Sequence, residues 1–113
     1  MTEEIILKSA RELANLFKTS DLYKDYLQYQ KALDEDPLLK ERVTAYKKLQ
    51  RDLETKRLKH GTVNFEEEKH VAHYYTELSL HPVAGPFLAS ENSLLDLYRQ
   101  VFDIITEACE MSE

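Results

Sequence analysis

The sequence is poor in residues that interrupt helices or cross-link chains. Its 113 residues include two glycines, three prolines and one cysteine. So few turn-forming residues disfavour a fold of short strands joined by tight turns. The single cysteine, Cys109, excludes a disulfide within the chain, and no basic segment followed by an apolar one opens the sequence. Together these features predict a protein of the reducing cytoplasm.

Long hydrophobic runs are also absent. No apolar stretch approaches the roughly 18 residues that a transmembrane helix requires, so we expect no membrane insertion. The sequence is instead 42% hydrophobic and 32% charged, a balance that is typical of amphipathic helices. Its length fits one domain over residues 1–113. We therefore predict a single all-α domain, a bundle of about five helices.

Capping and breaking residues divide the chain into five helical segments. Asp36 followed by Pro37 is a strong start signal, because Asp caps the free amides and Pro suits the first helical position. Gly61 is suited to end the same helix in the left-handed conformation. Pro86 is expected to kink the beginning of the last helix by removing one hydrogen bond. The predicted helices span about residues 2–18, 20–34, 37–60, 65–80 and 82–110.

The last of these segments is unusually apolar. At 100° per residue its hydrophobic side chains cover roughly 200° of the circumference, about twice what a surface helix needs. Two apolar flanks require two neighbours, so this long helix predicts a homodimer or larger oligomer. The alternative is that the chain's other helices cover it entirely. The residues expected in the oligomer interface are Phe87, Leu94, Leu95, Tyr98, Val101, Phe102 and Ile105.

One carboxylate falls inside that apolar arc. Glu91 lies among large hydrophobic residues, and an unpaired buried carboxylate is costly. Arg42 and Arg57 fall on the apolar side of the segment 37–60. We therefore expect a buried ion pair between Glu91 and either arginine, within one chain or across the oligomer.

The net charge of −6 conceals a basic segment. Residues 37–60 contain eight basic and three acidic side chains. Four of the basic residues, Lys40, Lys47, Lys48 and Arg51, gather on one sector beside the apolar face. This surface is either a contact for an acidic partner or RNA, or simply a solvated helix face. The acidic net charge and the lack of a nucleic-acid-binding motif argue against sequence-specific recognition of nucleic acid.

Evidence for catalysis is weak. Glu66, His70, His73 and Glu77 share one side of a helix, and Glu67 with His70 has the Glu-x-x-His spacing of helical di-iron proteins. No second such motif exists, so a solvated face is the favoured interpretation. The sequence has no nucleophile elbow, phosphate loop or zinc spacing. We predict no catalytic residue, no metal site and no cofactor.

Three segments carry a resemblance to a known family. They read ARELANLFKTSDLYKDYLQYQKALDEDPLLKERV, YKKLQRDLETKRLKHG and HPVAGPFLASENSLLDLYRQVFDIITEA. In order and spacing the chain resembles the YlbF/YmcA family of small helical bacterial proteins. The resemblance implies an oligomerising helical bundle with a regulatory role. Some members join a complex that modulates the membrane-anchored endoribonuclease Y and so affects mRNA processing, competence, sporulation and biofilm formation.

Some longer members of that family carry a cysteine-rich extension associated with iron–sulfur binding. A cluster held by one chain normally takes four protein ligands, which Cys109 alone cannot supply. The leading hypothesis is therefore a non-enzymatic, cytoplasmic, oligomeric regulator. It would contact other regulatory proteins through the segment 37–60 and through the tyrosines of the chain, among them Tyr23, Tyr26, Tyr29, Tyr74 and Tyr75. The rivals are an RNA-binding module that uses Lys40, Lys47, Lys48 and Arg51, and a metal-dependent helical enzyme.

Overall fold

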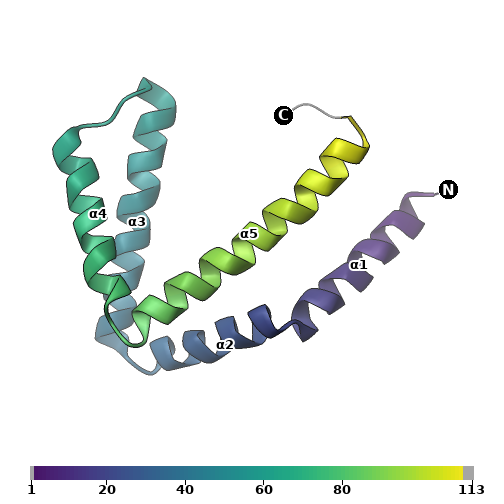
Figure 1. The fold of residues 1–113 in the computed structure, drawn as a ribbon, viewed down its shortest axis with the longest axis horizontal. Helices are drawn as coiled ribbons and strands as arrows, with labels where there is room; N and C mark the ends of the chain where they lie inside the picture. The colour runs from purple at the N-terminus through teal and green to yellow at the C-terminus, as the bar shows by residue number, and fades with distance from the viewer. Residues whose placement is uncertain (1, 111–113) are drawn as a thin grey trace. The chain divides into compact units, whose positions relative to one another are not determined.

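The computed structural model describes residues 2–110. They form five α-helices (Figure 1) and, within this range, no strand. The all-helical class and the number of helices are thus confirmed. The helices are α1 (Glu3–Thr19), α2 (Asp21–Asp34), α3 (Pro37–His60), α4 (Phe65–Ser79) and α5 (Ala84–Ala108).

Local capping chemistry sets the ends of α2 and α3. The Ser20 hydroxyl donates to the Phe17 carbonyl at the end of α1 and accepts from the Tyr23 amide in the first turn of α2. The Asp36 carboxylate accepts from the Leu39 amide, 3.2 Å away, as α3 begins. Gly61 ends α3 with φ of 75°. The predicted bounds of α3 are confirmed because both signals are local in sequence.

A histidine sets the start of α5, which occupies most of the predicted range 82–110. His81 Nδ1 accepts from the amides of Val83 and Ala84, at 3.0 and 3.3 Å, and the helix begins at Ala84. Pro86 therefore lies in the first turn, where an amide has no partner within the helix. The Gly85 and Phe87 amides on either side of it donate to the His81 and Val83 carbonyls. Pro86 has no amide to donate to the Pro82 carbonyl, so one hydrogen bond is missing as predicted, and the kink stays a prediction. Gly85 approaches α4 so closely that an added Cβ would clash with the Ser79 carbonyl.

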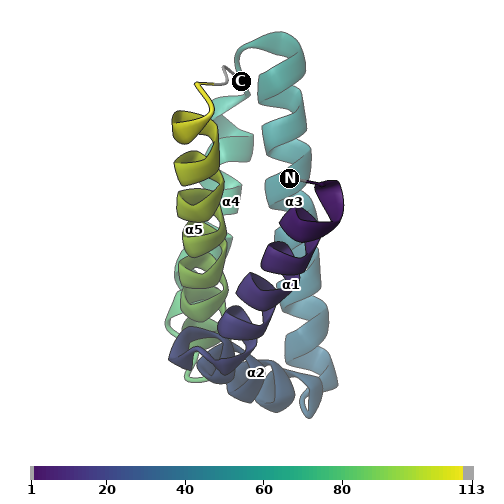
Figure 2. The same ribbon diagram turned by 90° about the vertical axis from the view of Figure 1, so that its right-hand side faces the viewer.

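The chain separates into two compact units, and each is described by itself. Unit 2 comprises residues 29–88. Its α3 and α4 run side by side in both views (Figure 1, Figure 2) and are joined by residues 61–64. The buried side chains of unit 2 are Leu33, Leu39, Val43, Tyr46, Leu53, Leu78, Ala84, Phe87 and Leu88.

Tyrosines and ion pairs join the two helices of unit 2. The Tyr46 ring lies 5.8 Å from both the Tyr74 and the Tyr75 ring. Lys56 Nζ is 2.8 Å from Glu67 Oε2 near the loop between the helices. The Tyr74 hydroxyl donates to the Arg42 carbonyl near the other end. These contacts fix an antiparallel register for α3 and α4.

Unit 1 comprises residues 1–28 and 89–113, of which 2–28 and 89–110 are described. The Phe17 and Tyr98 rings, 4.8 Å apart, join α1 to α5. No residue of α1 is buried. Among the residues of unit 1 that the structure describes, Leu94 alone is a buried hydrophobic residue. Within residues 2–110 no helix is long and apolar enough to cross a membrane.

Candidate interaction surfaces

An open groove runs along α3 in unit 2. It encloses about 660 Å³ and contains both basic and acidic side chains. Pro37, Thr44 and Ala45 are small, which leaves the hollow between the longer charged residues. We call this surface the α3 groove, and its lining residues are Asp34, Pro37, Lys40, Glu41, Thr44, Ala45, Lys48 and Arg51.

The cations of the α3 groove differ in how they are paired. Lys40 Nζ lies 2.9 Å from Asp34 Oδ1, with both side chains about half exposed. Lys48 and Arg51 are exposed, and in residues 2–110 neither has a carboxylate within ion-pair distance. The groove therefore offers two cations that an acidic ligand could reach without displacing an existing partner.

Lys47 does not belong to the groove. It is half-buried, and its ammonium lies 5.1 Å from the centre of the Phe87 ring, a cation–π contact that holds it against the start of α5. The structure thus brings three of the four predicted basic residues together and directs the fourth toward the core of unit 2. The helical wheel placed Lys47 beside the apolar face but could not identify Phe87 as its neighbour.

The second surface lies on unit 1 and is apolar. Nine large hydrophobic residues of α1 and α5 are each between 44% and 67% exposed. We call them the unit 1 apolar surface. They are Ile5, Ile6, Leu7, Leu16, Leu95, Tyr98, Phe102, Ile104 and Ile105.

The predicted interface residues divide between exposed and covered positions. Leu95, Tyr98, Phe102 and Ile105 belong to the unit 1 apolar surface, and Val101 is half-buried. Phe87 and Leu94 are 4% and 5% exposed, so the protomer itself already covers them. The exposed apolar residues of α1 were not predicted as part of an interface, although Ile5, Ile6 and Leu7 stand together in the sequence and cannot all face one side of a helix.

Two small hollows interrupt the unit 1 apolar surface. One, of about 170 Å³, is lined by Leu13, Leu16, Phe17, Ser20, Leu97 and Val101. The other, of about 230 Å³, is lined by Ala14, Phe17, Lys18, Tyr23 and Tyr98. An apolar cavity of about 150 Å³ can hold benzene, so each hollow could take one large side chain from a partner.

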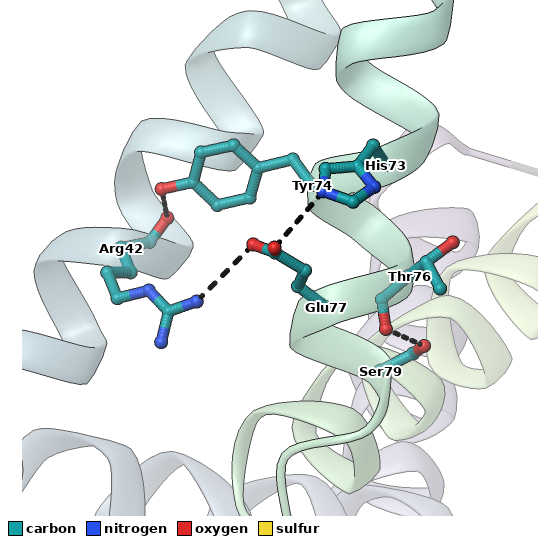
Figure 3. Close-up of polar contacts among 6 residues, drawn as sticks. All are labelled: Arg42, His73, Tyr74, Thr76, Glu77 and Ser79. Carbon is teal, nitrogen blue, oxygen red and sulfur yellow. Dashed lines mark hydrogen bonds and ion pairs between the residues drawn. The ribbon is translucent and has the colours of Figure 1, made fainter.

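The polar side of α4 contributes to packing in unit 2. Figure 3 shows Glu77 between His73, whose Nε2 is 3.1 Å from Oε1, and Arg42, whose Nη2 is 4.0 Å from Oε2. His70 packs edge-on against the Tyr74 ring. These side chains are exposed, and of these contacts the one between Glu77 and Arg42 joins α4 to α3. No group of three or more His, Cys, Asp or Glu residues within 2–110 is arranged to hold a metal ion.

The two arginines proposed as partners of Glu91 have carboxylate partners in unit 2. Arg42 approaches Glu77, and Arg57 lies 2.9 Å from Glu54 and 3.5 Å from Glu68. Both arginine side chains are about half exposed, and Glu91 is half-buried. The pair between Glu91 and an arginine stays a prediction.

One side chain in unit 2 has a clearly perturbed titration. Burial raises the pKa of the Tyr46 hydroxyl above its ordinary value of 10.0, and the nearby Tyr75 raises it further. A tyrosine with a raised pKa stays neutral at physiological pH and has no acid–base role there. The group therefore reports packing between α3 and α4.

Comparison with known proteins identifies the family of the chain. A family described as "Control of competence regulator ComK, YlbF/YmcA" matches residues 6–110. A UPF0342 protein of Caldicellulosiruptor saccharolyticus is 32% identical over 104 residues, covering 92% of this chain and 87% of that protein. A UPF0342 protein of Caldicellulosiruptor bescii is 29% identical with the same coverage. No solved structure is significantly similar. The chain belongs to the YlbF/YmcA family, whose description is the control of a competence regulator.

Proposed function

We propose that the chain is a non-enzymatic cytoplasmic regulator that acts as a homo-oligomer through contacts with other regulatory proteins. The family description, which names control of the competence regulator ComK, supports the regulatory role. The observation that carries the oligomer is the unit 1 apolar surface. Its residues come from two helices, one of which buries no side chain.

The size of this surface supports a stable partner. A free large apolar side chain exposes roughly 200 Å², so nine that are about half exposed present roughly 1,000 Å². The largest apolar patch on a typical monomer is about 300–600 Å². A standard interface buries about 800 Å² on each partner. Ile5, Ile6 and Leu7 point to different sides of α1, and Ile104 lies nearly opposite Phe102 on α5, so one interface would cover only part of this area.

A second copy of the chain is the proposed partner. In a two-fold symmetric dimer each copy presents the same surface, so the hollows beside Phe17 on one copy face protruding side chains of the other. Exposed rings such as Phe102, 56% exposed, are suited to fill such hollows. Such a dimer removes apolar area from water at both protomers at once.

The mass in solution tests the dimer. Leu95→Glu with Ile105→Glu places two carboxylates in the unit 1 apolar surface and should convert the oligomer to monomers, measured by light scattering after size exclusion. The matched control is Leu58→Glu with Leu80→Glu, at exposed apolar positions of unit 2. Circular dichroism verifies that both variants remain helical. An oligomer that survives the first double change would place the interface elsewhere.

The finer proposal concerns the process that is regulated. We propose that the oligomer modulates ribonuclease Y-dependent mRNA processing and through it competence, sporulation or biofilm formation. The family resemblance supports this proposal. An affinity pull-down from the native cell should recover ribonuclease Y or proteins bound to it. Recovery of an unrelated complex, with no effect of deletion on transcript processing, would contradict it.

Direct RNA binding is the alternative for the α3 groove, favoured by Lys48 and Arg51, which have no carboxylate partner in the described chain. Against it, Asp34 and Glu41 line the same groove and repel phosphates. A groove with both signs of charge suits a helix with both signs better than a uniformly anionic backbone.

A further inference from the structure

The two units differ sharply in charge. Unit 1 has five basic and eleven acidic residues, whereas unit 2 has ten of each. The whole net charge of −6 therefore belongs to unit 1. The cations of unit 2 are concentrated on α3, where the groove lies. Unit 1 of one copy and the α3 groove of another are thus electrostatically complementary.

The polar side of α5 provides the acidic element. Asp96, Asp103 and Glu107 recur at intervals of seven and four residues, which places them on one side of the helix. Asp96 and Glu107 are exposed, and Asp103 is half-buried. We call these three residues the α5 acidic face.

The spacing of the α5 acidic face matches that of the α3 groove. Lys40, Lys48 and Arg51 recur at intervals of eight and three, so both sets span eleven residues, about 16 Å of helix. In a parallel alignment Lys40 meets Asp96, Lys48 meets Asp103 and Arg51 meets Glu107. The small side chains of the groove leave space for a second helix to approach.

We propose that the α3 groove binds the α5 acidic face of a second copy of the chain. The acidic residues of the groove support this occupant over RNA. With Lys40 aligned to Asp96, Ser90 lies opposite Asp34 and Leu97 lies opposite Glu41, so no carboxylate of the α5 acidic face meets an acidic residue of the groove. The helix thus places carboxylates only opposite the cations of the groove, whereas a phosphate backbone would also place negative charge near Asp34 and Glu41.

This contact responds to salt in the opposite direction to the proposed dimer. Two copies of unit 1 that meet through their apolar surfaces bring like net charges together, so screening strengthens that association. The groove contact joins opposite charges, so screening weakens it. The groove contact can form without the proposed dimer. The expected assembly larger than a dimer needs both the groove contact and the proposed function's apolar dimer.

The experiment is sedimentation of the full chain at about 0.02 M and about 0.5 M salt. Salt screens the charge interactions only weakly at the lower concentration and strongly at the higher one. The wild type should form an assembly larger than a dimer at low salt and revert to a dimer at high salt. Lys48→Glu and Asp103→Lys, at two positions that meet in this alignment, should each raise the dissociation constant of the larger assembly about tenfold, since each replaces an attraction by a repulsion. The double variant should restore it.

A matched control uses the same helix. Lys59 is exposed on α3 but does not line the groove, so Lys59→Glu makes the same charge change away from the contact. It should leave the larger assembly unchanged. Equal weakening by Lys59→Glu and Lys48→Glu, or no rescue in the double variant, would overturn the groove contact.

The outcomes separate this proposal from the dimer. A protein that is monomeric at high salt but associates at low salt, with rescue by the double variant, would retain the groove contact and refute the apolar dimer. A dimer of constant mass at both salt concentrations would refute the groove contact alone. If a labelled RNA of about 20 nucleotides binds only at low salt and Lys48→Glu abolishes its binding, while the mass stays that of a dimer, the groove is an RNA site and the proposal is wrong.

Discussion

Replacement of Gly85 by alanine should destabilise the junction between α4 and α5. Gly85 lies in the first turn of α5, and a Cβ added there would clash with the backbone carbonyl of Ser79, the last residue of α4. A backbone atom at a helix end cannot move aside as a flexible side chain can. The substitution should therefore act as overpacking of a tight contact.

The expected magnitude is the balance of two terms. Overpacking costs about 1–3 kcal/mol. Alanine recovers up to about 1 kcal/mol of helix propensity relative to glycine, and less near a helix end. A net loss of about 1.5 kcal/mol follows, which in a domain of this size lowers Tm by roughly 6 °C.

Urea denaturation followed by circular dichroism measures this difference. Ser93→Ala, at an exposed position of the same helix, is the control and should change the unfolding free energy by less than about 0.5 kcal/mol. A Gly85→Ala variant at least as stable as the wild type would refute the close approach of α5 to Ser79.

Three further predictions concern single side chains. Asp36→Ala removes the cap of α3 and should cost about 1 kcal/mol in urea denaturation, whereas Asp36→Asn should retain most of it. Because the pKa of Tyr46 is raised in the folded state, its contribution to stability is complete below the unfolded pKa of about 10 and is lost as pH rises through the folded pKa. Stability should thus fall in alkali, and Tyr46→Phe should make that fall shallower; equal slopes would contradict this. If Glu91 forms its predicted ion pair, Glu91→Gln should weaken stability or assembly, and no change in either by denaturation and sedimentation would reject the pair.

Helix ends could be predicted where the signal lies in the neighbouring residues, and less closely where it does not. Asp36, Pro37 and Gly61 act through their own backbone geometry, so the bounds of α3 follow from the sequence. The start of α5 depends on His81, whose ring nitrogen caps the helix although histidine is not a preferred capping residue. Pro86 interrupts the hydrogen bonds at that end, between the amides of Gly85 and Phe87, which donate to the carbonyls of His81 and Val83.

The surfaces were only partly predictable because periodicity identifies a face but not its neighbour. The wheel grouped Lys47 with three other cations, yet the contact with Phe87 depends on how α5 begins against α3. Arg57 similarly pairs with Glu68 of α4, a partner that requires the antiparallel register of α3 and α4. The pairing with Glu54 could have been anticipated from the spacing of three residues.

Unit 1 combines two properties that oppose each other in association. Its apolar surface favours contact with another copy, while its eleven acidic and five basic residues repel one. Repulsion acts over about 10 Å at moderate ionic strength, whereas apolar attraction requires direct contact. Copies that approach in arbitrary orientations are therefore kept apart, and only a geometry that buries a large part of the apolar surface overcomes the charge. Neutralising substitutions such as Asp103→Asn should thus strengthen the proposed dimer while weakening the groove contact. Sedimentation at both salt concentrations would measure the two effects separately.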